Sequence, residues 1–227
     1  MTENADWITL EPRHDAFALS AWRTPAAGER RGGLVLIQEI FGITEDIKRV
    51  CAEFAAEGYE VLAPSLFDRI EPRVQIPHDE AGVARGRDYT SRKGLDELAG
   101  DVQAAIDRLL PDGAVFLTGF CYGGSVAWLA ASRCSGLKAV SAYYGRLILQ
   151  HQDEGPKCPI ILHWGRKDAT IPLEQVEDFM ASRPELVNYL YDAGHGFVSS
   201  RPSHHDRESA RIAMTRTLEL FRGSLGA

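Results

Sequence analysis

Cys121 lies in a segment whose residue types could display a reactive side chain. Residues 115–120 are mostly apolar, Gly119 and Gly123 stand two positions on either side of the cysteine, and a helical pattern follows over 125–132. This is the strand–turn–helix context of the G-x-S-x-G nucleophile elbow, with sulfur in place of the hydroxyl. A turn this tight favours glycine at 119 and 123, and the nearby helix N-terminus favours the thiolate. The segment therefore predicts a cysteine nucleophile.

Two further residues could complete a proton-transfer system with this sulfur. Asp168 follows an apolar segment that ends at Trp164, and His195 stands between two glycines after segment 187–191. A triad needs a nucleophile, an imidazole that handles protons and a carboxylate that orients the imidazole. The chain order nucleophile, acid, histidine, each after a strand, is that of the α/β-hydrolases. We expect Cys121, Asp168 and His195 to meet in space.

Each of these residues also has an ordinary structural explanation. An isolated cysteine is usually a small buried hydrophobe, and we interpret Cys51 and Cys134 in this way. Asp168 alone could be a turn residue or a helix N-cap, and His195 alone could be a surface histidine. The combination of the elbow with two partners in the right order favours catalysis.

Other classes of site fit the sequence poorly. The glycines near Cys121 do not form G-x-G-x-x-G, and no P-loop lysine with Ser or Thr is present. His204 and His205 are adjacent and point to different faces, and the remaining histidines lack ligand spacing. We expect neither a metal nor a cofactor.

The composition limits the classes of binding partner and the cellular compartment that we expect. The 227 residues have an apolar fraction of 44% and a net charge of −7, which is typical of a globular protein and argues against nucleic-acid binding. The sequence shows no signal peptide and no apolar run long enough to span a bilayer. Its four cysteines form neither a CxxC pair nor a disulfide framework. We expect a cytoplasmic protein without a membrane partner, as a monomer or small homo-oligomer.

The remaining elements must position the candidate residues. Apolar, β-rich segments alternate with helical patterns from residue 33 onward, which predicts βαβ units and a parallel sheet in one doubly wound domain over 1–227. Expected strands are 33–38, 61–64, 115–120, 137–143, 159–164 and 187–191, preceded by one or two edge strands over 7–22 with a turn near 12–15. Expected helices begin at the N-cap Thr44 and near 95, 125, 173 and 206. Residues 67–92 are polar, contain five arginines and predict a long functional loop.

Several motifs together resemble the dienelactone hydrolase family of the α/β-hydrolase superfamily. They extend from about residue 33 to 200, and the resemblance implies an α/β-hydrolase fold with a mostly parallel sheet flanked by helices. The matching segments are Gln38-Glu39-Ile40-Phe41-Gly42, Ala63-Pro64-Ser65-Leu66, Gly119-Phe120-Cys121-Tyr122-Gly123-Gly124, Tyr143-Tyr144-Gly145, the segment 165–172 and Ala193-Gly194-His195-Gly196-Phe197.

The resemblance also implies roles for individual residues. Cys121, Asp168 and His195 would form the triad, and Glu39 would contact the resting thiol and help it to ionise. A carboxylate beside a thiol opposes thiolate formation unless it also accepts the proton; its ordinary alternative is a strand-end carboxylate bonded to nearby backbone. The oxyanion hole would consist of the backbone N–H groups of Ile40 and Tyr122.

Substrate binding is where the sequence departs from the family. Lactone-cleaving members have a serine directly after the catalytic histidine and an arginine three residues further on, which hold a substrate carboxylate together with a loop arginine. Here the two positions are Gly196 and Ser199. Arg69 matches the loop arginine, and Arg201 is the nearest substitute for the second one.

We therefore expect a hydrolase that opens a small ester or enol lactone through a thioester on Cys121. The weakened carboxylate clamp motivates an alternative, a broader carboxylesterase or thioesterase. A non-catalytic module that binds ligands or senses oxidation through Cys121 is a third possibility, although it would have no need of Asp168 and His195.

Overall fold

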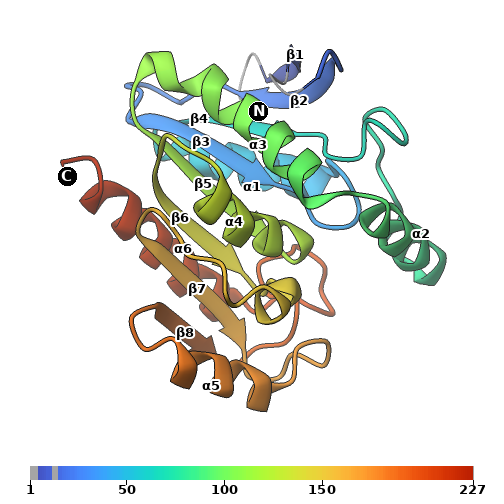
Figure 1. The fold of residues 1–227 in the computed structure, drawn as a ribbon, viewed down its shortest axis with the longest axis vertical. Coiled ribbons are helices and arrows are strands. Elements are labelled where there is room, and N and C mark those ends of the chain that lie inside the picture. Colours follow the sequence, from blue (N-terminus) through green and yellow to red (C-terminus); the bar gives the residue numbers. More distant parts are fainter. Residues whose placement is uncertain (1–4, 12–14, 227) are drawn as a thin grey trace.

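One sheet organises residues 5–11 and 15–226, the part of the chain that the computed structural model describes (Figure 1). Its eight strands follow the order β1-β2-β4-β3-β5-β6-β7-β8. Strand β2 is antiparallel to both of its neighbours, and the pairs from β4 to β8 are parallel. The strands are β1 (Asp6–Leu10), β2 (Leu19–Thr24), β3 (Gly32–Ile37), β4 (Tyr59–Pro64), β5 (Val115–Phe120), β6 (Leu137–Tyr143), β7 (Ile160–Gly165) and β8 (Val187–Tyr191).

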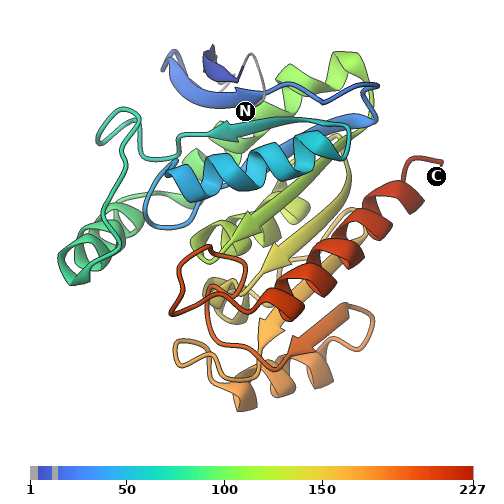
Figure 2. The ribbon, with the colours of Figure 1, turned by 180° about the vertical axis from the view of Figure 1, so that it is seen from behind.

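Helices cover both faces of this sheet. Helices α1 and α6 lie on one face, and α3, α4 and α5 lie on the other (Figures 1 and 2). Every residue of β3, β4, β5 and β7 is buried as a result, which explains their continuous apolar segments. The helices are α1 (Glu45–Ala56), α2 (Glu80–Ser91), α3 (Leu95–Leu109), α4 (Tyr122–Arg133), α5 (Leu173–Ser182) and α6 (Arg207–Gly223), with short 3₁₀ segments η1 (Leu110–Asp112) and η2 (Arg146–Gln150).

Most of the predicted elements are confirmed. The strands and the helices α1, α3, α5 and α6 agree with the sequence prediction to within one or two residues. Thr44 is the N-cap of α1, and its side chain accepts a hydrogen bond from the Ile47 N–H. The predicted antiparallel edge is present as β1 and β2, whereas residues 12–14 of the predicted turn lie outside the described residues.

The prediction of a long loop over 67–92 was wrong in part, because this segment contains α2. The Asp79 side chain caps the helix by accepting from the Gly82 N–H at 2.7 Å. Its buried residues are Gly82, Gly86 and Tyr89, and a Cβ atom at position 86 would lie 2.5 Å from the Ile40 carbonyl oxygen. Because two of these three residues are glycines, the helix has little apolar periodicity to detect.

Helix α4 also begins earlier than predicted, at Tyr122 and not at residue 125. Gly123 and Gly124 are typical of a turn, but here they lie in the first turn of a buried helix. This places Cys121 directly between the last residue of β5 and the first residue of α4. No helix among the described residues is long and apolar enough to cross a membrane.

Candidate active site

Cys121 occupies the sharp turn between β5 and α4. Its φ and ψ angles are 56° and −115°, a conformation that L-residues rarely adopt. Its N–H donates to the Tyr143 carbonyl oxygen at 3.0 Å. A Cβ atom at Gly119 would collide with the Gly123 carbonyl oxygen, and one at Gly123 would lie 2.6 Å from the Gln38 carbonyl oxygen. The strained turn is held by its neighbours and leaves the cysteine partly exposed.

The imidazole of His195 is oriented by Asp168. The two residues follow β8 and β7, and His195 Nδ1 lies 2.6 Å from Asp168 Oδ2. The other oxygen, Oδ1, accepts from the Thr170 N–H and hydroxyl at 2.7 Å and from the Ile171 N–H at 3.1 Å. Burial acts to raise the pKa of Asp168, but the hydrogen bonds from His195 and Thr170 outweigh it and lower the pKa. Asp168 is therefore a fixed anion.

His195 lines the same cavity as Cys121. Burial acts to lower the pKa of His195, but attraction to the Cys121 thiolate, together with hydrogen bonds to Asp168 and Cys121, raises the pKa to about 10. The Tyr144 ring packs against the imidazole with 4.9 Å between centroids. The structure thus places Cys121 and His195 in the lining of one cavity, with Asp168 bonded to the far side of the imidazole.

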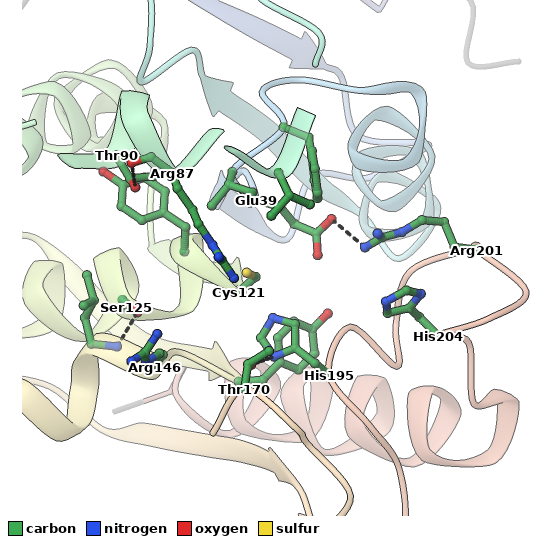
Figure 3. A pocket seen from close by; sticks show the side chains of 16 residues that line it. Glu39, Arg87, Thr90, Cys121, Ser125, Arg146, Thr170, His195, Arg201 and His204 are labelled. Atoms are coloured by element: carbon green, nitrogen blue, oxygen red, sulfur yellow. Dashed lines mark hydrogen bonds and ion pairs between the residues drawn. The ribbon is translucent and has the colours of Figure 1, made fainter. Parts of the chain in front are cut away.

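Glu39 follows β3 and lines the same cavity as Cys121 (Figure 3). Its carboxylate is buried, with Oε2 lying 3.6 Å from Nη2 of Arg201. Burial raises the pKa of Glu39, and the charges of Arg201 and His195 oppose this rise. Glu39 therefore shares the cavity of the thiol, while its ion-pair partner is Arg201.

The two predicted oxyanion-hole residues also line this cavity. Tyr122 is the first residue of α4, and the first N–H groups of a helix have no partner within it. Ile40 lies in the loop between β3 and α1, against Gly86 of α2. Their backbone groups thus belong to the two segments that a hydrolase uses to bind an oxyanion.

The cavity has a volume of about 310 Å³ and a cationic lining. Arg87 of α2 reaches toward Cys121 from one wall, and Arg146 of η2 lies on the same side (Figure 3). Both arginines are exposed, and among the described residues neither has a carboxylate partner. Of the described residues, Glu39 is the only acidic one in the lining. Sequence analysis missed both arginines, although Arg87 belongs to the arginine-rich segment 67–92.

Arg69, in contrast, does not line the cavity. Its guanidinium pairs with Asp101 at 2.8 Å and with Asp15 at 2.7 Å, and it lies 4.3 Å above the Phe17 ring. Asp101 is buried on α3 and needs this cation. The structure therefore separates Arg69 from Arg201, which does line the cavity, and the pair predicted to bind substrate is not assembled.

No group of three or more His, Cys, Asp or Glu side chains within residues 5–11 and 15–226 is placed to hold a metal ion. The site as described contains a thiol, the two imidazoles of His195 and His204, two carboxylates and three arginines.

The strand order, with parallel strands from β4 onward and a residue of strained conformation between β5 and α4, defines an α/β-hydrolase fold. Within this class the chain belongs to the dienelactone hydrolase family, whose model matches residues 20–225. The resemblance inferred from the motifs is thereby confirmed.

Individual relatives agree with the family assignment. A carboxymethylenebutenolidase of a Pseudomonas species is 32% identical over 209 residues, with 87% of each chain covered. A crystal structure described as "Putative Dienelactone Hydrolase" from Klebsiella pneumoniae superimposes with a TM-score of 0.83 at 24% identity, covering 97% of this chain and 99% of the other. A dienelactone hydrolase-like promiscuous phosphotriesterase from metagenomic libraries gives a TM-score of 0.74 at 19% identity, covering 97% and 99%. The two structures support the fold, and the family makes the chain a carboxylic ester hydrolase.

Proposed function

We propose that the chain opens an enol lactone or small carboxylic ester through a thioester on Cys121. The observation that carries the proposal is a cysteine of φ 56° at the start of α4, in the same cavity as an imidazole that lies 2.6 Å from a buried carboxylate. These three groups are of the types that acyl transfer needs as nucleophile, base and orienting acid.

Acylation begins with the Cys121 thiolate attacking the carbonyl carbon. The C–S bond forms, and the carbonyl oxygen becomes an oxyanion that the backbone N–H groups of Tyr122 and Ile40 stabilise. When the tetrahedral intermediate collapses, the C–O bond breaks and an enolate departs. An enolate is a stabilised leaving group, so this step needs no strong acid.

Glu39 accounts for the proton of a resting thiol. In the proposed sequence the Glu39 carboxylate accepts this proton as substrate arrives and later makes it available to the departing enolate. Burial raises the pKa of Glu39 and makes it a better base than an exposed glutamate. A raised pKa therefore supports a role in proton transfer.

Deacylation uses the imidazole as a base. His195 removes a proton from water, the hydroxide attacks the thioester carbonyl, and the C–S bond breaks with return of the proton to sulfur. Asp168 keeps Nδ1 protonated, so that Nε2 is the atom that handles the proton. Acid product and free enzyme result, with one water consumed.

Replacement of the nucleophile tests this mechanism. Cys121→Ala should abolish turnover of an activated enol ester, and parent protein mixed with that ester should gain the mass of one acyl group in intact-mass spectrometry. The Cys51→Ala variant provides a control, because Cys51 lies on the buried face of α1. Parent-like turnover by Cys121→Ala would refute the mechanism. A stable sulfenate without any acyl adduct would instead favour the redox-sensing module.

The charge of the cavity supports a substrate that carries an anionic group. Arg87 of α2 and Arg146 of η2 line the cavity, and within the described part of the chain neither has a carboxylate partner and no acidic lining residue other than Glu39 opposes them. An anion beside the scissile bond would compensate these charges. The proposed substrate is therefore a carboxylate-bearing ester or lactone.

A neutral ester remains the second candidate, and a specific observation favours it. Gly196 offers no hydroxyl beside His195, and the cavity also has apolar lining from Phe41, Val83 and Leu147. Comparison of kcat/KM for a carboxylate-bearing enol lactone and its methyl ester distinguishes the two candidates. A clear preference for the methyl ester would remove the anionic substrate.

The cytoplasm is the proposed setting for this chemistry. All four cysteines are free, and a reducing compartment would keep Cys121 as a thiol. Fractionation of cells that express the chain, with activity assayed in each fraction, tests this part of the proposal.

A further inference from the structure

A chain of hydrogen-bonded and charged groups runs from the first turn of α1 to Glu39. The Ser199 hydroxyl donates to Asp46 Oδ2 at 2.8 Å, and Nε of Arg201 donates to Ser199 Oγ at 2.9 Å. Nη2 of Arg201 lies 3.6 Å from Glu39 Oε2. The chain thus joins α1, the loop that follows His195, and the carboxylate beside the nucleophile.

Ser199 is chemically suited to its place in this chain. It is 4% exposed, so its hydroxyl must find partners within the protein. A hydroxyl has one donor and two lone pairs. Its donor is used by the Asp46 anion, which leaves the oxygen free to accept from the Arg201 cation. An alanine at this position could hold neither group.

Asp46, the first group in this series of contacts, is also held by residues other than Ser199. Asp46 also accepts from the Ser200 N–H at 3.1 Å and pairs with Arg49 at 2.8 Å. Nη2 of Arg49 in turn donates to the Val198 carbonyl oxygen at 3.2 Å. The loop is therefore attached to α1 at several points, and the hydroxyl of Ser199 connects this attachment to the Arg201 guanidinium.

We propose that Asp46 and Ser199 are positioning residues that hold the Arg201 guanidinium against Glu39 and so keep Glu39 ionised before substrate binds. This inference rests on the proposed role of Glu39 as acceptor of the thiol proton, because only the ionised carboxylate can accept it.

The charges around Glu39 determine which neighbours favour its ionised form and which disfavour it. Burial disfavours its anion, Arg201 and His195 favour the anion, and Asp46 by its own negative charge disfavours it. Asp46 therefore favours ionisation of Glu39 only indirectly, by holding the residue that positions Arg201. The other titratable or charged residues of the same cavity are Cys121, Tyr122, Tyr144, Arg87, Arg146 and His204.

The Ser199→Ala variant provides the first test. Without its hydroxyl partner, Arg201 should spend less time beside Glu39, and an Arg–carboxylate contact lowers a carboxyl pKa by about one unit or more. The acid limb of the pH profile of kcat/KM should therefore move up by about one pH unit. At pH values below this limb kcat/KM should fall about tenfold, and on the plateau it should change little. Ser199→Thr, which keeps the hydroxyl, should restore the parent profile.

Ser200→Ala is the matched control. Ser200 is the next residue, is exposed, and reaches Asp46 through its backbone N–H alone. Its profile should coincide with that of the parent. If Ser199→Ala merely loosened the loop, the loss would extend over all pH values and Ser199→Thr would not rescue it, which would overturn the inference.

A double-mutant cycle separates this inference from the function on which it depends. Arg201→Gln should move the same limb, and Ser199→Ala added to it should have no further effect. If Glu39→Gln leaves the acid limb in place, the proposed role of Glu39 fails. If Glu39→Gln removes the limb while Ser199→Ala leaves it unmoved, only the positioning role fails. Should Ser199→Ala fold poorly, the Arg201→Lys variant, which loses Nε, provides the same comparison.

Discussion

The two walls of the cavity are built on different principles. On the wall formed by the loops after β5, β7 and β8, Asp168 makes four hydrogen bonds, one of them with His195 Nδ1. On the α2 wall, Val83, Arg87 and Thr90 face the cavity from a helix whose buried contacts include Gly82 and Gly86. The first wall has its polar groups paired, whereas Arg87 on the second has no carboxylate partner among the described residues.

This difference suggests that the first wall serves proton transfer and the α2 wall serves substrate selection. A group that must handle protons at a fixed atom needs partners that define its orientation and ionisation before substrate arrives. A group that selects substrate by charge has to keep its donors available until binding. We therefore expect substitutions on the first wall to change kcat and substitutions on the α2 wall to change KM.

Among the substitutions that test this comparison of the two walls, Asp168→Asn should have the largest effect. An asparagine can hold His195 in the wrong tautomer, and in a triad this change lowers kcat by about 10³–10⁴-fold. Steady-state kinetics on an activated ester measures the loss, and circular dichroism verifies that the fold is intact. A loss of less than tenfold would mean that Asp168 does not orient the catalytic imidazole.

Arg69→Gln should affect stability and not substrate binding. The substitution removes one cation from the buried Asp101, while Lys93 Nζ remains 3.4 Å from Asp101 Oδ2. Because one partner remains, we expect a loss of about 2 kcal/mol in the free energy of unfolding, less than the 3–5 kcal/mol typical of a fully broken buried pair. Urea unfolding measures it. A higher KM at unchanged stability would mean that Arg69 contributes to substrate binding.

Arg87→Gln tests the α2 wall directly. If Arg87 binds the anionic group of the substrate, KM for a carboxylate-bearing lactone should rise about tenfold or more, which corresponds to about 1.4 kcal/mol, while the methyl ester should be unaffected. Arg85→Gln is the control, because Arg85 lies on the same helix but bonds to Tyr89 and Glu71 outside the cavity. An equal change for both substrates would indicate a structural role.

Cys121→Ser should lower the pKa of His195. Burial already acts to lower this pKa, and attraction to the thiolate is the largest influence that raises it to about 10. A serine hydroxyl stays neutral, so we expect a fall of about one unit or more. The stability that comes from protonated His195 in the parent is complete below its ordinary pKa and is lost as the pH rises through about 10. NMR titration of His195 measures the change. Identical titrations in parent and variant would exclude an ion pair between the Cys121 thiolate and protonated His195.

The sequence predicted the first wall better than the second. Strands buried on both faces and the strand–turn–helix at Cys121 follow from local patterns, and the order of Asp168 and His195 follows from the loops after two strands. The α2 segment has few apolar residues, because Gly82 and Gly86 make its close contacts. Local periodicity could not reveal a helix of that kind.

The charged partners escaped prediction for a different reason. Asp46 and Ser199 are 153 residues apart, and Arg69 and Asp101 are 32 apart. No local pattern states which arginine finds a buried carboxylate and which faces the cavity. Arg69 and Arg87 have the same chemistry in the sequence, and only packing separates their roles.

The contact between Gly86 and the Ile40 carbonyl oxygen has a consequence for engineering. Through this contact α2, which faces the cavity, packs directly on the segment that would supply an oxyanion donor. Replacing the helix therefore also risks displacing that donor. A library that randomises positions 83, 87 and 90 while retaining glycine at 82 and 86 would vary the specificity surface and leave this packing intact. The same helix grafted with a bulkier residue at 86 would be expected to alter every substrate's turnover at once.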